Sequence, residues 1–393
     1  MVPTHAFCRH RPKCCTRGAL SKVFRNNRAR SVCLSMSSVA ELKRLYGAGK
    51  KRKILALLTV SFAIIAATII SISLGAGSPR FNEAMQVILA KLFPSLGIDP
   101  GPNITQIIIW NLRLPRVILA IIAGAGLAAS GATMQGVLRN PLVSSYILGI
   151  SAAAGFGAAL AIVFGVGIIE GYGHYLIIAN AFFFSVLAMV LVYCIARIRA
   201  MTPETIILAG VAVGYLFSAM LSLIQYVAPE HQAVRAVVFW LMGGLNAANW
   251  ESVQIVFPIV LVTIILMIFQ SWNINVLSMG EDVATSLGVN SKRVLAITMV
   301  LETLATATII AFTGVIGFIC LISPHISRML IGSDHRFLIP CSALVGACLL
   351  LCSDTVGRLV MQPTELPVGI VTSLLGVPFF LYILISKRRQ SWR

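Results

Sequence analysis

The stretch GVIGFICLISPHISRMLIGSDHR, residues 314–336, decides the fold class of this chain. It places His325 and Arg328 within an apolar run, and acidic residues follow at Asp354 and Glu365. Ionisable side chains inside apolar sequence are costly in a membrane, and they are kept there for structural or transport roles. The stretch therefore predicts a polytopic membrane transporter.

The composition excludes a soluble globule. Hydrophobic residues make up 58% of the 393 residues and charged residues only 11%, whereas charged residues are about a quarter of a soluble domain. Apolar runs recur from Ile54 to Ile385. Many approach the roughly 20 residues that a spanning helix needs, and they exceed the alternating strands of an outer-membrane barrel. We predict an all-α integral membrane protein with about ten transmembrane helices.

Two regions are expected along the chain, a basic tail over residues 1–50 and a transmembrane domain over residues 51–390. The predicted spans of that domain are, in order, Ile54–Leu74, Pro115–Met134, Ser144–Phe164, Tyr175–Ile195, Ile206–Val227, Val253–Trp272, Val294–Phe312, a short one at Gly314–Ile326, Phe337–Val360 and Val368–Ile385.

The formal net charge of +18 follows membrane topology rather than nucleic-acid binding. Of the 31 Lys and Arg residues, 14 precede Ile54, and most others fall on the same side of the membrane if the spans alternate. The exceptions are Arg80, Lys91, Arg113, Arg116, Arg235 and Arg358. Because cytoplasmic loops carry the excess of basic residues, we predict that both termini lie in the cytoplasm. The membrane is expected to be the plasma (inner) membrane.

The tail has no acidic residue over residues 1–40. Such a segment cannot bury a core, and we expect disorder. Three alternatives stay open: a cytoplasmic tail that touches anionic lipid, translation that starts at Met36, or an organellar transit peptide. Cys14 and Cys15 are adjacent and lack a spaced partner pair, so no metal site is predicted.

The segment NLRLPR, residues 111–116, opens the second predicted span. Proline in the first turn of a helix costs no hydrogen bond. Arg113 and Arg116 are three residues apart, so both project from the same side of the helix mouth. Two guanidinium groups there suit the carboxylates of a docking partner, and snorkelling to lipid headgroups explains them equally well.

The second span contains GAGLAASGATMQG, residues 124–136, whose small residues let helix backbones approach closely. We therefore predict that this span is buried in the bundle. Asn140 and Pro141 then break the helix. The segment after them is interpreted either as a pathway-lining re-entrant turn or as a short interhelical loop.

Two short segments are predicted on the cytoplasmic side. Thr202 and Pro203 fit the N-cap and first residue of a helix, as part of a gate or as a plain cap. Residues 278–289 fit a short amphipathic helix that could occupy a groove on a partner, although an unpartnered surface helix would have the same pattern. In that helix Glu281 and Asp282 lie near the start, Val283, Ala284 and Leu287 form the apolar stripe, and Gly288 ends it.

Three ionisable residues remain inside predicted spans: Glu302, His325 and Asp354. Asp354 precedes Arg358 by four residues, the spacing of a helical ion pair, and we interpret the two as structural or rim residues. Glu302 has no interpretation from its neighbours. No pair among the three has the spacing of metal ligands.

Taken together, these segments resemble the permease family of iron-siderophore, heme and vitamin B12 ABC importers, the FecCD type. The matching motifs stand in the family's order: LRLPR at Leu112, RNPL at Arg139, GEDVATSLG at Gly280, GVIGFICLISPHISR at Gly314, GSDHR at Gly332, SDTVGR at Ser353 and ELPVGI at Glu365. The chain departs from the family in Cys320, where a Gly commonly sits, in Thr202 and Pro203, and in the basic tail.

The resemblance implies a type II ABC importer. Two copies of a ten-helix subunit, or this chain with a closely related second permease, would surround one translocation path in the lipid. Two cytoplasmic ATPase subunits and an extracytoplasmic substrate-binding protein would complete it, with no role for nucleic acid. No G-x-x-x-x-G-K-[ST] phosphate loop occurs in the chain. We therefore expect a transport subunit without enzyme activity or cofactor, with ATP and Mg bound by the partner ATPase.

The resemblance also assigns roles to single residues. It implies docking of the binding protein at Arg113, Arg116 and Arg358. It implies contact with the ATPase at the loop of Gly280, Glu281, Ala284, Leu287 and Gly288, and an inner gate at Thr202 and Pro203. The remaining motif residues are expected to be structural, namely Asn140, Pro141, Pro324, His325, Arg328 and Asp354.

The expected cargo is a metal chelate, with ferric siderophore first and cobalamin or heme next. One alternative is an ion-coupled secondary transporter, which would use a carboxylate such as Glu302. A zinc or manganese ABC importer is another. A membrane-embedded enzyme is disfavoured because no nucleophile, base and orienting group stand together in the sequence.

Overall fold

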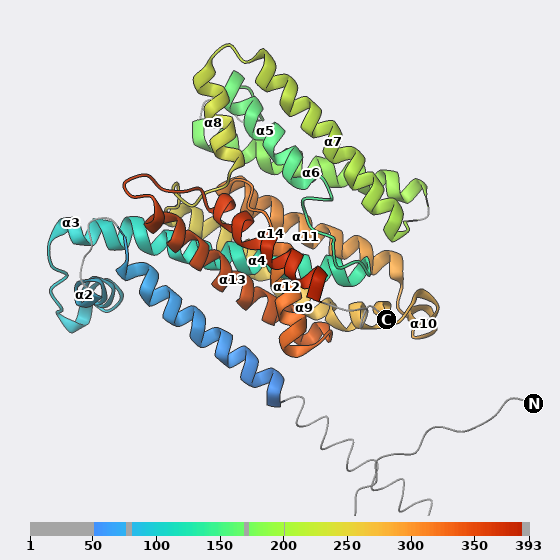
Figure 1. Cartoon of the computed structure of the whole chain (residues 1–393), viewed down its shortest axis with the longest axis horizontal. Helices are drawn as coiled ribbons and strands as arrows, with labels where there is room; N and C mark the ends of the chain where they lie inside the picture. Colours follow the sequence, from blue (N-terminus) through green and yellow to red (C-terminus); the bar gives the residue numbers. More distant parts are fainter. Residues whose placement is uncertain (1–50, 76–80, 169–172, 200, 387–393) are drawn as a thin grey trace, which may run out of the picture. The chain divides into compact units, whose positions relative to one another are not determined.

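The computed structural model describes residues 51–75, 81–168, 173–199 and 201–386 (Figure 1), and these contain helices, turns and loops but no β-strand. Seven of the described helices are long and apolar enough to cross a membrane: Lys51–Ser73, Asn103–Val137, Gly173–Ile198, Pro203–Val227, Trp250–Ser278, Ser291–Thr313 and His335–Val360. Three shorter apolar helices are Ile150–Phe164, Ile319–Ile331 and Val368–Tyr382. The all-α membrane fold is thus confirmed, and each predicted span overlaps one of these helices.

The described elements that follow the helix Lys51–Ser73 are α2 (Phe81–Leu92), η1 (Pro94–Leu96), α3 (Asn103–Gln106), η2 (Ile107–Arg113), α4 (Leu114–Val137), α5 (Ile150–Phe164), α6 (Gly173–Ile198), α7 (Pro203–Val227), α8 (His231–Leu241), α9 (Trp250–Ser278), α10 (Glu281–Ser286), α11 (Ser291–Thr313), α12 (Ile319–Ile331), α13 (His335–Val360) and α14 (Val368–Ser386). The predicted basic tail lies outside the described residues, so the division at residue 50 stays a prediction.

The short predicted span at Gly314–Ile326 begins too early. Gly314 and Phe318 both have positive φ angles, of 68° and 67°, which a right-handed helix does not accept. Residues 314–318 therefore form a loop, and α12 runs from Ile319 to Ile331. Residues 315–318 of this loop border a cavity.

The second spanning helix begins earlier than its proline predicts. Its first turns are α3 and η2, and η2 is a π-helix in which the Leu114 amide bonds to the Ile109 carbonyl five residues back. A π-turn widens the helix at the place where Pro115 supplies no amide hydrogen. Pro115 thus lies inside one apolar helix, Asn103–Val137, rather than at its mouth.

The helices form two packed groups (Figure 1). In one group α5 packs against α6, α7 and α8. In the other α4 packs against α9, α11, α12 and α13, and α14 contacts α12 and α13. Because α11 contacts α4, α5 and α6, it joins the two groups. α4 is buried along nearly its whole length, as its small residues predict.

Close backbone contact explains why α4 carries small residues. A methyl group on Gly124 would overlap the Gly346 carbonyl on α13, and a methyl group on Gly346 would overlap the Gly124 carbonyl. A methyl group on Gly131 would overlap the Cys320 carbonyl on α12. In a lipid bilayer the hydrophobic effect does not drive helices together, so close van der Waals packing of this kind is what stabilises their association.

Pro324 explains why the Cys320 carbonyl is available to α4. A proline inside a helix has no amide hydrogen for the carbonyl four residues before it. Here that carbonyl belongs to Cys320, and Gln135 Nε2 on α4 donates to it at 3.5 Å. The same amide group donates to the Val143 carbonyl at 3.4 Å, so Gln135 joins α4, α12 and the segment after α4.

The Gly131→Val substitution is expected to lower the thermal unfolding midpoint of the purified protein in detergent, because overpacking a tight core costs about 1–3 kcal/mol. Gly173→Val is the matched control, since no atom of the described residues lies within 4 Å of a Cβ placed there. Equal midpoints for the two variants would contradict the close contact between α4 and α12.

Candidate functional site

Asp354 is a buried anion shared by two arginines at one end of the bundle, which we call the Asp354 end. Arg116 Nε lies 2.9 Å from Oδ1 and 3.2 Å from Oδ2 of Asp354, and Arg116 Nη2 lies 2.8 Å from Oδ1. Arg358 Nε donates to Oδ2 at 3.1 Å. The predicted helical pair of Asp354 and Arg358 is thus present, and Arg116 joins it from α4.

Arg113 and Arg358 also close the end of the helix Lys51–Ser73. Arg358 Nη2 donates to the Ser71 hydroxyl at 2.6 Å and to the Ser71 carbonyl at 3.2 Å. Arg113 donates to the Ile72 carbonyl. The last carbonyls of a helix have no donor within the helix and favour a nearby cation. The two arginines therefore supply donors to the last carbonyls of this helix.

Glu365 is the exposed acidic member of this cluster. Its Oε2 lies 2.7 Å from Arg116 Nη1, and its side chain is 38% exposed while that of Asp354 is fully buried. Glu365 and Arg116 border an open cleft of about 530 Å³, which we call the Glu365 cleft. Leu112, Phe239 and Asn246 also line it.

The three arginines of the Asp354 end are buried rather than displayed. Arg113, Arg116 and Arg358 are 6%, 9% and 7% exposed. The sequence predicted Arg113 and Arg116 at a helix mouth, free for a partner or for lipid headgroups, and it predicted an internal partner for Arg358 alone. Their docking role stays a prediction, with Arg116 reachable through the Glu365 cleft.

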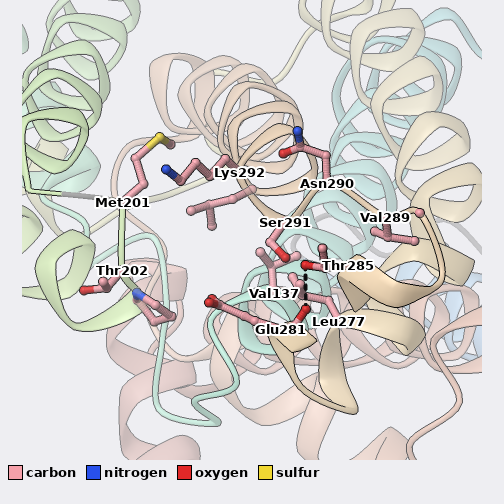
Figure 2. Close-up of a pocket in the computed structure, with 13 residues that line it drawn as sticks. Val137, Met201, Thr202, Leu277, Glu281, Thr285, Val289, Asn290, Ser291 and Lys292 are labelled. Carbon is pink, nitrogen blue, oxygen red and sulfur yellow. Dashed lines mark hydrogen bonds between the residues drawn. The ribbon is translucent and has the colours of Figure 1, made fainter. Parts of the chain in front are cut away.

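The predicted gate and the predicted coupling loop meet at the opposite end of α4, which we call the α10 end. A pocket of about 460 Å³, which we call the Thr202 pocket, lies between them (Figure 2). Thr202 and Pro203 come from the start of α7, and Glu281 and Thr285 from α10. The first residues of α11 line the remaining side, among them Ser291 and Lys292. Two segments far apart in sequence thus form one site.

The local structure around Thr202 agrees with the sequence. Its hydroxyl accepts a hydrogen bond from the Thr205 amide at 3.3 Å, and Pro203 is the first residue of α7. The capping prediction is confirmed. The gating role that shares these residues stays a prediction.

α10 forms as predicted, but its apolar stripe is divided. Ala284 is fully buried, whereas Val283 and Leu287 are 40% and 61% exposed. Gly288 lies just after the helix with a φ of 77°, the left-handed conformation that is typical of a glycine at a helix C-terminus. Gly280, which precedes the helix, has a φ of 120°. The helix therefore rests on the bundle through Ala284 and presents Leu287 outward.

Two polar contacts fix the α10 end to the rest of the bundle. Arg139 Nη2 lies 3.5 Å from Glu281 Oε1, which joins the turn after α4 to α10. On α9, the Asn275 side chain donates to Asp334 Oδ1 at 2.8 Å and accepts from the His335 amide at 2.9 Å. No sequence pattern predicted these contacts, because the partners are distant in the chain.

Asp334 keeps its charge at neutral pH. Burial acts to raise the pKa of this carboxyl, but hydrogen bonds from Arg336 and Asn275 lower the pKa to about 2. Asp334 also caps α13 by accepting from the Arg336 amide. Asp334 therefore remains a charged acceptor for Asn275 at neutral pH.

A larger cavity of about 680 Å³, the Ser145 cavity, lies against the segment after α4. Ser144, Ser145 and Tyr146 line one side, the 315–318 loop and the start of α12 line another, and α14 contributes Ser373. The break at Asn140 and Pro141 thus leads into a cavity-lining segment. Asn140 stabilises the break by accepting from the Leu142 amide at 3.0 Å.

Glu302 lies behind the hydroxyl groups of this cavity. It is 0% exposed on α11, and Thr306 donates to its Oε1 at 3.4 Å. The Thr306 and Ser145 hydroxyls, which both border the cavity, lie 3.3 Å apart. Of the other motif residues, Pro324 and His325 are buried within α12 and Arg328 lies in its last turn. Their structural role stays a prediction.

The Asp354→Asn substitution is expected to destabilise the protein by about 3–5 kcal/mol, because two buried guanidinium groups lose their common counter-ion. Asp282→Asn is the control, since Asp282 is an exposed acid on α10. Thermal unfolding in detergent measures both variants. A wild-type midpoint for Asp354→Asn would show that this anion does not hold the cluster together.

Comparison with known proteins places the whole membrane region in one family. The family model described as the FecCD transport family matches residues 63–386. The Fe(3+)-citrate import system permease protein YfmE of Bacillus subtilis is 37% identical over 87% of this chain and 98% of that protein. The molybdate import system permease protein MolB of Haemophilus influenzae is 36% identical over 86% of this chain and 96% of that protein.

A solved structure shows the same fold. It is of a metal-chelate type ABC transporter in an inward-facing conformation, and it is 32% identical with a TM-score of 0.73. The alignment covers 84% of this chain and 99% of that chain. On this evidence the chain belongs to the FecCD transport family, as an integral membrane permease of the ABC transporter type.

Proposed function

We propose that this chain is the membrane-spanning subunit of an ABC importer for a metal chelate, with ferric siderophore as the leading cargo and cobalamin or heme next. The observation that carries the proposal is the arrangement of three features along the bundle: the arginine cluster at the Asp354 end, the Ser145 cavity, and the Thr202 pocket beside α10. A relative named for Fe(3+)-citrate supports a ferric chelate as the cargo. A relative named for molybdate makes an oxyanion the cargo to test against it.

In this proposal the α10 end faces the cytoplasm and the Asp354 end faces outward. Both termini then lie in the cytoplasm, and Arg139, Arg197, Lys292 and Arg293 lie on the side where basic residues accumulate. Two copies of the chain in the lipid, or this chain with a second permease, surround the path. Two ATPase subunits, which bind ATP and Mg, dock against α10, and a substrate-binding protein docks on the arginines.

The Ser145 cavity is this subunit's share of the path. Its lining combines apolar side chains with the hydroxyls of Ser145, Thr306 and Ser373 and has no charged side chain among its described residues. Such a wall lets different chelates pass without binding them tightly, so selection falls to the binding protein. Thr202 and Pro203 act as the inner gate because they border the pocket next to α10.

One observation favours a second function, an ion-coupled secondary transporter. Glu302 places a carboxyl group inside the membrane region behind the cavity wall, which is where a coupling residue would be needed. A zinc or manganese importer of the ABC type is the further alternative, and it differs in cargo alone.

Proteoliposomes that contain the permease, its ATPase and its binding protein are expected to take up ferric siderophore when ATP is present on the ATPase side. Cobalamin, heme, molybdate and zinc are tested in the same vesicles. Preferential uptake of zinc would move the assignment to the zinc and manganese importers, and preferential uptake of molybdate would replace the chelate by an oxyanion.

The Leu287→Asp substitution is expected to weaken binding of the ATPase subunit at least about tenfold, because an apolar side chain buried in an interface contributes about 1.5–3 kcal/mol. Leu92→Asp is the matched control, since Leu92 is 58% exposed on α2. Co-purification of the ATPase with each variant gives the measurement. Unchanged binding for Leu287→Asp would remove α10 from the ATPase interface.

A further inference from the structure

We propose that Glu365 is an internal substitute for the docking carboxylate of the binding protein. Glu365 pairs with Arg116 while no binding protein is docked. On docking, an acidic side chain of the binding protein displaces Glu365 from Arg116. The proposal rests on the docking role given above to the arginines of the Asp354 end.

The two carboxylates bound to Arg116 differ in a way that fits permanent and exchangeable partners. Asp354 is 0% exposed and bonds to two guanidinium groups. Glu365 is 38% exposed, and Arg116 is the one residue of the described segments with which it forms an ion pair. Removing Asp354 would leave buried charge uncompensated. The Glu365 side of its ion pair with Arg116 is open to solvent, which screens this pair more than the pair with Asp354, so Glu365 can exchange at lower cost.

The guanidinium group of Arg116 is divided between these two partners. Nε and Nη2 face Asp354, and Nη1 faces Glu365 at 2.7 Å. The Nη1 side borders the open Glu365 cleft. An incoming carboxylate therefore meets Arg116 from the side that Glu365 already holds, and the two anions compete for one donor.

The position of Glu365 also connects this exchange to the cavity. It lies in the segment between α13 and α14, and the Leu366 amide beside it donates to the Gly357 carbonyl at 3.0 Å. α14 begins three residues later, at Val368. Gly369, Ile370 and Ser373 of α14 line the Ser145 cavity. Displacement of Glu365 thus acts on the segment that leads into the cavity wall.

The Glu365→Gln substitution tests the proposal through the affinity of the purified substrate-binding protein for the complete permease–ATPase complex in nanodiscs. We expect about two- to fivefold tighter binding, the range set by the loss of one partly exposed competing ion pair. Glu230→Gln is the control for general surface charge, because Glu230 is an exposed acid before α8. It lies at the C-terminal end of α7, away from the Thr202 pocket at the start of that helix. Binding by Glu365→Gln that equals or falls below wild type would overturn the proposal.

Arg116→Gln in the same assay separates this proposal from the docking role itself. Asp354 keeps Arg358 as its counter-ion in that variant, and the thermal unfolding midpoint reports whether the fold is retained. Unchanged affinity for Arg116→Gln would reject docking at this arginine. Weaker binding by Arg116→Gln without tighter binding by Glu365→Gln would reject only the substitute role. The double variant is expected to bind like Arg116→Gln, and Glu365→Asp, which keeps the charge, is expected to stay near wild type.

Discussion

The close contact of α4 with α12 and α13 is the constraint on which the other features of this chain depend. Gly124 meets Gly346, and Gly131 meets the Cys320 carbonyl that Pro324 leaves without a helical partner. With no side chain between the backbones, the register of α4 against α13 is fixed. That register brings Arg116 onto Asp354 at one end of the bundle. At the other end it sets the segment after α4 beside α10.

Local sequence patterns predicted much of this fold because their causes lie within one helix. Apolar runs predicted the ten apolar helices of the described residues, and small residues predicted the burial of α4. The four-residue spacing predicted the ion pair of Asp354 and Arg358. Thr202 and Pro203 predicted the start of α7 for the same reason, since a helix N-cap depends on residues that are adjacent in sequence. The family resemblance added roles for residues that such patterns cannot assign.

The remaining features depend on contacts between distant segments. Arg116 is separated from Glu365 by 249 positions, and Asn275 from His335 by 60, so no periodicity relates them. The amphipathic helices α2 and α8 were missed because each is too short to register as a span. The apolar stripe at α10 was predicted as one surface that could fit a groove on a partner. In the structure Ala284 is buried against the bundle, whereas Leu287 is exposed.

The central claim is that ATP hydrolysis by a partner subunit drives transport through this chain. It is tested most directly by uptake of ferric siderophore into proteoliposomes that carry the complete complex, with ionophores present to collapse every ion gradient. The account predicts uptake that continues with ionophores and stops when the partner ATPase carries a mutation that blocks hydrolysis. Uptake that stops with ionophores and continues with the blocked ATPase would contradict it and would make Glu302 the residue to study.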